Sequence, residues 1–114
     1  MNRATVPQQV EIEEIVKRIV EVAQPEQVLL FGSTARGTTG PHSDLDFLVI
    51  KAGRYNARTV AGVIYQRMRG IVLSIDLIIV TPKQVAEYRN SPFSVVYPAV
   101  REGRVVYERK KTVA

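Results

Sequence analysis

The segment LLFGSTARGTTGPHSDLDFLVI occupies residues 29–50 and contains the features that decide the fold. It begins with an apolar run, turns at Gly32 and Ser33, crosses a polar stretch and enters a second apolar run. Asp44 and Asp46 stand at the start of that second run. Charged carboxylates are costly to bury without a partner, so their place at the start of an apolar strand indicates that they bind something.

The two apolar runs predict two strands joined by a short helix and a loop. Residues 28–31 are expected to form the first strand, which Gly32 ends. Ser33 is a favourable N-cap for a short helix through Arg36. Residues 44–50 are expected to form the second strand, which beyond its aspartates is apolar on both faces, as is typical of a central strand.

Outside this segment the chain alternates between helical and strand patterns. Further helices are predicted at 10–23, at 57–68, from Pro82 after the cap Thr81 and at 93–101, and further strands at 71–80 and 104–107. This alternation predicts an α/β (α+β) protein in which helices pack on a sheet. The pattern leaves open whether neighbouring strands are parallel or antiparallel.

Length and composition limit the class of protein. The 114 residues predict a single domain over residues 1–114 with one modest core. The absence of cysteine excludes disulfides, thiolate metal sites and cysteine nucleophiles. Because no apolar run is long enough to span a bilayer and residues 1–9 contain no signal-peptide core, we expect a cytoplasmic protein that does not bind a membrane.

The net charge of +5 favours an anionic partner, either a nucleotide, a nucleic acid or an acidic protein. Much of the charge lies late in the chain, and we interpret this end as frayed and solvated, at Arg101, Arg104, Arg109, Lys110 and Lys111. Direct nucleic-acid binding is disfavoured because no aromatic stacking pattern accompanies the charge.

The paired aspartates have the spacing of a metal site. Asp44 and Asp46 are two apart on the predicted strand, so both side chains lie on one face, with Cα atoms about 6.6 Å apart. Two carboxylates on one face repel unless a cation lies between them. Mg²⁺ prefers oxygen ligands and commonly takes a couple of carboxylates together with substrate phosphates.

Asp76 and the Gly-Ser turn complete the candidate site. Asp76 stands in the apolar run 71–80, and it can reach the paired aspartates if the two strands are neighbours. Three carboxylates can hold two metal ions about 3.5–4 Å apart for in-line phosphoryl displacement. Gly32 allows close backbone approach to a phosphate, Ser33 adds a hydroxyl at a helix N-terminus, and Arg36 is a candidate phosphate clamp.

Each feature alone has an ordinary explanation. A Gly-Ser pair is a common turn, an Asp-x-Asp pair is usually a solvated strand end, and Arg36 alone is more often a surface residue. Asp76 alone could be a satisfied buried acid or an edge residue. Their joint order along the chain is hard to explain by accident, and it favours a phosphate and metal site.

The order Gly32-Ser33, a ten-residue gap, and Asp44-Leu45-Asp46 resembles the signature of nucleotidyltransferases related to DNA polymerase beta, and in particular the minimal nucleotidyltransferases, or MNT proteins. The string SIDLIIVTP resembles their strand with the third carboxylate, and VVYPAVREGRVVYE resembles their C-terminal helix and strand. The resemblance implies a mixed sheet flanked by helices, as in the polymerase beta palm.

The resemblance also implies a chemistry and a site. It implies Mg²⁺, with two ions expected, and ATP as the substrate. Gly32 and Ser33 would bind the triphosphate, and Asp44 and Asp46 would bind metal. Asp76 would complete the metal site and activate the acceptor, so the three aspartates would be catalytic.

Many MNT proteins pair with a helical HEPN ribonuclease toxin, and the resemblance implies an antitoxin that transfers AMP to a tyrosine of such a toxin in a hetero-oligomer. The short chain agrees, since little remains beyond the sheet to hold an acceptor. Two alternatives stay open at this point. One is a small-molecule acceptor such as an aminoglycoside, and the other is a non-enzymatic antitoxin that neutralises by binding.

Overall fold

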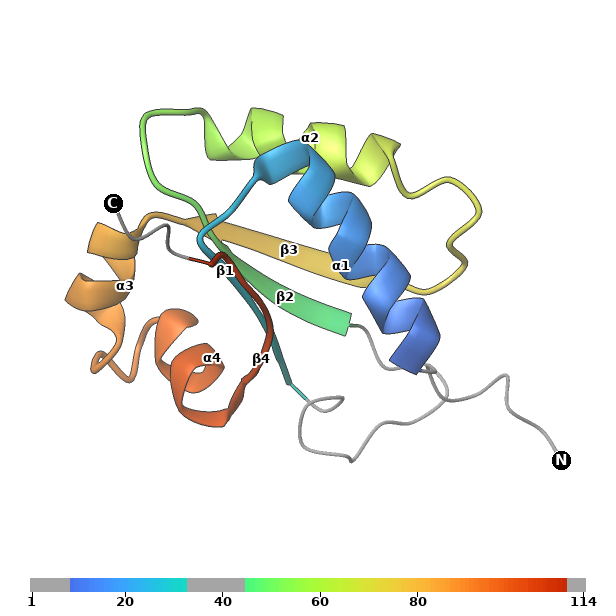
Figure 1. Cartoon of the computed structure of the whole chain (residues 1–114). Helices are drawn as coiled ribbons and strands as arrows, with labels where there is room; N and C mark the ends of the chain where they lie inside the picture. Colours follow the sequence, from blue (N-terminus) through green and yellow to red (C-terminus); the bar gives the residue numbers. More distant parts are fainter. Residues whose placement is uncertain (1–8, 33–44, 111–114) are drawn as a thin grey trace, which may run out of the picture.

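A computed structural model describes residues 9–32 and 45–110 of the chain. The strands in these residues are β1 (Gln27–Phe31), β2 (Leu45–Ile50), β3 (Ile75–Val80) and β4 (Arg104–Glu108). They form one sheet in the order β3-β2-β1-β4 (Figure 1). β2 is parallel to β3 and antiparallel to β1, and β1 is antiparallel to β4. The sheet is therefore mixed, and the prediction that β2 is a central strand is confirmed.

One face of the sheet is covered by α1 (Gln9–Ala23) and α2 (Ala57–Gln66) (Figure 1). α1 buries an apolar stripe at helical spacing, which includes the fully buried Ile15 and Ile19. Every second residue of β2 meets these helices, and Phe47 is completely buried among them. The Arg18 guanidinium also donates hydrogen bonds to the Arg67 and Arg69 carbonyl oxygens, at 3.1 and 2.7 Å, and so fastens α1 to the segment after α2.

The opposite face carries α3 (Pro82–Tyr88) and α4 (Val96–Glu102). The predicted start of α3 is confirmed, because Thr81 and Gln84 form a reciprocal capping box with Pro82 in the first turn. Val96 and Ala99 of α4 pack on the second core cluster, which also contains Leu29, Phe31, Leu48, Ile50 and Val80. The predicted stop of α4 at Gly103 is also confirmed.

Two predicted starts are wrong by three residues or more, and the helix predicted at 57–68 ends two residues early, at Gln66. β3 begins at Ile75 rather than at residue 71, and Leu45–Ile75 is the first pair of its register with β2 among the described residues. Ile71 and Leu73 still pack on the first core cluster, whereas Val72 is 93% exposed. α4 begins at Val96 rather than at residue 93, after a turn in which the Val96 N–H donates to Ser94 Oγ.

The interpretation of the basic C-terminal region as a frayed end is wrong for the part that the structure describes. Arg104 begins β4, and the Arg109 backbone N–H donates to the Glu26 carbonyl oxygen at 2.9 Å. The Arg109 guanidinium contacts the Gln24 carbonyl oxygen and the Glu26 carboxylate. Pairing of β4 with β1 orders this region. Among the described residues, no helix is long and apolar enough to cross a membrane.

Candidate functional site

Asp46 and Asp76 lie side by side on the parallel strands β2 and β3. They are direct partners in the register, between the pairs Leu45–Ile75 and Phe47–Leu77. Paired residues of neighbouring strands have backbones about 4.8 Å apart and project to the same face. The two strands are therefore neighbours, as the sequence analysis required for Asp76 to reach the aspartates of the second strand.

The two aspartates face the side of the sheet that carries α3 and α4. Leu48 and Ile78, two residues further along each strand, belong to or pack on the second core cluster of that face. α3 follows the far end of β3, and α4 packs on β1, so the start of β2 and β3 lies beyond both helices (Figure 1). Asp46 is half-buried there, and Asp76 is exposed to solvent.

Gly32 lies against the Asp46 carboxylate. Phe31 is the register partner of Asp46, so the chain passes the carboxylate as it leaves β1. Gly32 has a φ of +82°, a conformation that favours glycine, and a Cβ at this position would overlap Asp46 Oδ2. Two independent constraints therefore require glycine, and the backbone of residue 32 is held close to one of the candidate metal ligands.

The charges of this site suit a hard cation. Two carboxylates on adjacent strands repel each other unless a cation lies between them. Their oxygens match the ligands that Mg²⁺ takes. The described residues contain no group of three or more metal-ligand side chains. Ser33, Arg36 and Asp44 lie outside the described residues, so the structure brings together Gly32, Asp46 and Asp76 of the predicted set.

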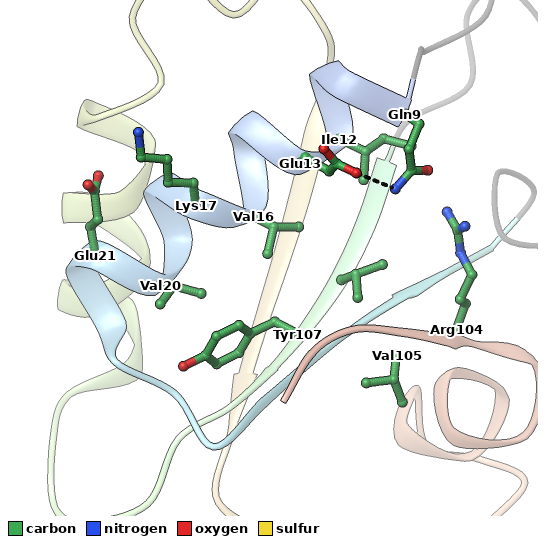
Figure 2. A pocket seen from close by; sticks show the side chains of 11 residues that line it. Gln9, Ile12, Glu13, Val16, Lys17, Val20, Glu21, Arg104, Val105 and Tyr107 are labelled. Atoms are coloured by element: carbon green, nitrogen blue, oxygen red, sulfur yellow. Dashed lines mark hydrogen bonds between the residues drawn. The ribbon is translucent and has the colours of Figure 1, made fainter. Parts of the chain in front are cut away.

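The structure also has a groove that the sequence analysis missed. It lies between α1 and β4 on the face opposite the aspartates, and its volume is about 510 Å³ (Figure 2). We call it the α1–β4 groove, and its lining residues are Gln9, Ile12, Glu13, Val16, Lys17, Val20, Glu21, Arg104, Val105, Val106 and Tyr107. It forms because β4 pairs with β1, a long-range contact that carries no signal in a single sequence.

Comparisons with known proteins agree with this architecture. Residues 10–112 match the family described as Nucleotidyltransferase domain. Among solved structures, a protein from Sulfolobus solfataricus assigned as a nucleotidyltransferase has a TM-score of 0.62 at 22% identity, over 92% of this chain and 84% of that chain. Among curated proteins, none matches the chain significantly.

Two further similar structures are toxin–antitoxin complexes. One was solved with AMP-PNP, and it aligns with a TM-score of 0.59 at 19% identity, over 86% of this chain and 74% of that chain. The other, MntA-HpeT, carries two Asp-to-Glu substitutions two positions apart and aligns with a TM-score of 0.58 at 18% identity over the same shares, 86% and 74%. At these identities the likeness establishes a shared fold.

Proposed function

The chain belongs to the nucleotidyltransferase domain family, and from this premise we propose that it is a Mg²⁺-dependent enzyme that transfers AMP from ATP to a hydroxyl group of a partner protein. The observation that carries the proposal is the register of β2 and β3, which sets Asp46 beside Asp76 with Gly32 against the Asp46 carboxylate. Two acids on one face of the sheet, with the backbone of Gly32 against one of them, suit a metal-bound triphosphate.

We assign roles to the site residues as follows. Asp44 and Asp46, with Asp76, hold the metal ions, and Gly32, Ser33 and Arg36 bind the triphosphate. When bound, Mg²⁺ supplies positive charge against the phosphates. The exposed Asp76 is the carboxylate that an acceptor can approach, and it takes the proton of the acceptor hydroxyl.

The proposed step is an in-line displacement at the α-phosphorus of ATP. The acceptor oxygen forms a bond to this phosphorus while the bond to the oxygen that bridges to the β-phosphate breaks. AMP remains on the acceptor, pyrophosphate leaves, and the acceptor proton passes to Asp76. The choice of an adenine nucleotide is supported by the similar structure solved with AMP-PNP.

We further propose that the acceptor is a tyrosine of a HEPN-type ribonuclease toxin and that the chain acts as the antitoxin in a hetero-oligomer. Two of the similar structures are toxin–antitoxin complexes, and in one of them a pair of aspartates with the spacing of Asp44 and Asp46 was substituted. The described chain consists of the sheet and its four covering helices, which leaves no separate unit there for an acceptor. A second protein would therefore present it.

The test incubates the chain with α-labelled ATP, Mg²⁺ and the protein encoded by the adjoining reading frame. Asp46→Asn and Asp76→Asn should each lower label transfer by about 10²–10⁴-fold, the usual contribution of a positioned acid or base. Glu87→Gln is the matched control, because it makes the same acid-to-amide change at an exposed residue of α3. It should transfer at the wild-type rate.

The other outcomes choose between rival functions. Undiminished transfer in both aspartate variants would contradict the assigned roles. If the partner stays unlabelled and the Asp46→Asn chain still neutralises it, the chain acts by binding and not by catalysis. In a parallel incubation with an aminoglycoside, label on that compound and none on the protein would make the acceptor a small molecule.

A further inference from the structure

The α1–β4 groove has an apolar interior between polar margins. Val20 of α1 and Tyr107 of β4 face the space between these elements, and Val106 lines it as well (Figure 2). These three side chains are only partly buried, although they pack on the first core cluster. Glu13, Lys17 and Glu21 are exposed along the α1 side. A helix-covered face of a sheet normally buries such an apolar strip, so the described residues cover this one incompletely.

The partly exposed apolar strip lies where a further helix could pack beside α1. α2 packs against β3, and α1 packs beside α2, while α1 has few contacts with the outermost strand β4 (Figure 1). A helix is about 10 Å wide and strands lie about 4.8 Å apart, so α1 and α2 together have about the width of four strands, yet Val20, Val106 and Tyr107 stay partly exposed in the groove. A further helix on the outer side of α1 would cover these side chains.

A strand is a poor occupant of the same place. The register of β4 against β1 shifts between Val28 and Leu29, so β4 carries an irregularity in its middle. Its ends carry the exposed charges of Arg104 and Glu108. Bulges and charged residues are the usual protection of an edge strand against a further strand. A helix packed on the groove needs no backbone pairing with that edge.

A second copy of the chain cannot supply the helix from its described residues. The exposed large hydrophobic residues are Val10, Tyr65, Val72, Tyr88, Phe93, Val95 and Val105, and each described helix contains at most one of them. A helix that fills an apolar groove presents a stripe at positions i, i+3, i+4 and i+7. The described helices of a second copy are therefore poor occupants, and we assign the groove to the partner protein that the proposed function requires.

We propose that the α1–β4 groove docks an amphipathic helix of the partner protein, about three turns long and with basic, acidic and basic residues along one flank. That order complements Glu13, Lys17 and Glu21, which follow one another at one-turn spacing on α1. The inference rests on the proposed function in one respect, that the acceptor belongs to a protein. It adds the surface that holds that protein.

The groove leads toward the proposed catalytic end of the sheet. Arg104, which lines the groove, pairs with Leu30 on β1, and the next residue Phe31 pairs with Asp46. Gln9, at the start of α1, lines the same end of the groove (Figure 2). The groove and the aspartates lie on opposite faces of the sheet but reach the same end of it. A docked protein can therefore present an acceptor around that end.

The first experiment maps the contact in the complex co-purified from cells that express the chain with the product of the adjoining reading frame. The photo-reactive amino acid benzoylphenylalanine replaces Tyr107 in the groove, or Phe93, which is 98% exposed and outside it. Both changes put an aromatic residue in place of an aromatic residue. We expect cross-links from position 107 to one helical stripe of the partner and none from position 93.

Cross-links from position 93 alone, from position 107 to a second copy, or to an extended segment would overturn the inference, as would failure to obtain any complex. The second experiment uses Val20→Asp, which places a charge in the apolar interior of the groove. This substitution should weaken partner binding more than about 30-fold, as is typical of a central interface residue. Lys17→Glu, on an exposed helical position that cannot disturb the core, should weaken it about 2–5-fold.

The two proposals fail in different ways. Val20→Asp should lose AMP transfer to the protein while it still binds ATP, and Asp46→Asn should lose transfer while it still binds the partner. Wild-type partner affinity in both Val20→Asp and Lys17→Glu would contradict the docking role of the groove and leave the proposed function intact. Wild-type AMP transfer in Asp46→Asn would contradict the assigned catalytic role and leave the docking role of the groove untouched.

Discussion

The two faces of the sheet differ in how completely they are covered. One face carries α1, with 15 residues, and α2, with 10, over a core that includes the largest fully buried side chains. The other carries α3 and α4, with seven residues each, over a smaller core. The long helices stabilise the sheet, and the short ones do not extend over the start of β2 and β3, where the two aspartates lie. Stability and candidate chemistry are thus divided between the faces.

The division is sharpest at two consecutive residues of β2. Phe47 points into the first core cluster and is completely buried. Asp46 points to the opposite face and is half-buried beside Asp76 and Gly32. If the division is real, changes on the α1–α2 face should act on folding, and changes at the aspartates should act on ligand binding and transfer.

Phe47→Ala should have the largest effect on folding. Truncation of a fully buried phenylalanine removes apolar contact and leaves a cavity, at a typical cost of about 3–5 kcal/mol in the free energy of unfolding. Urea denaturation followed by circular dichroism measures this loss. Phe93→Ala is the matched control, because the same truncation at a residue 98% exposed should change the free energy by less than about 0.5 kcal/mol. Equal losses in the two variants would contradict the assignment of the core to this face.

Gly32→Ala should have an intermediate effect on folding and a large effect on the site. The strained backbone should cost about 1–3 kcal/mol, and the new Cβ should displace the Asp46 carboxylate that it overlaps. Urea denaturation gives the first quantity, and titration calorimetry with MgATP gives the second. We expect a clear loss of MgATP affinity.

Gly70→Ala separates the two causes. Gly70 has a similar φ of +85°, but a Cβ there meets nothing within 4 Å. This variant should show the backbone strain alone and keep its affinity for MgATP. If Gly70→Ala weakens MgATP binding as much as Gly32→Ala does, then the close approach of residue 32 to Asp46 is not what matters.

The sequence predicts the local elements better than their pairing. The apolar period of α1 and the Thr81-Pro82 start of α3 depend on neighbouring residues, and both are confirmed. The start of β3 depends on where β2 begins, so the β-branched run alone placed it too early. The α1–β4 groove depends on the pairing of β1 with β4, which are distant in the chain.

The candidate site was visible for a related reason. Asp46 and Asp76 are charged residues in otherwise apolar strands, and this contrast is visible in the sequence without knowledge of any tertiary contact. Their parallel register could not be read, since it follows from the order of strands across the sheet. The roles of Ser33, Arg36 and Asp44 stay predictions, because these residues lie outside the part of the chain that the structure describes.

Thr81→Ala should have the smallest effect, and it tests how the less covered face is held together. α3 has no buried residue, and its first turn depends on hydrogen bonds from Gln84 N–H to Thr81 Oγ1 at 3.1 Å and from Thr81 N–H to Gln84 Oε1 at 2.8 Å. Loss of an N-cap costs about 1 kcal/mol. Because α3 can open without disturbing the sheet, we expect faster amide hydrogen exchange in α3 and an almost unchanged urea midpoint.

Asn56→Ala removes the equivalent cap on the other face, where Asn56 Oδ1 accepts from the Thr59 N–H at 3.0 Å. α2 buries Ile64 in the first core cluster, so it cannot open without exposing that core. The same loss of about 1 kcal/mol should therefore lower the urea midpoint of the whole chain. If both cap variants changed only local exchange, or both changed the global midpoint, the two faces would not differ in cooperativity, and the division of labour between them would need another physical basis.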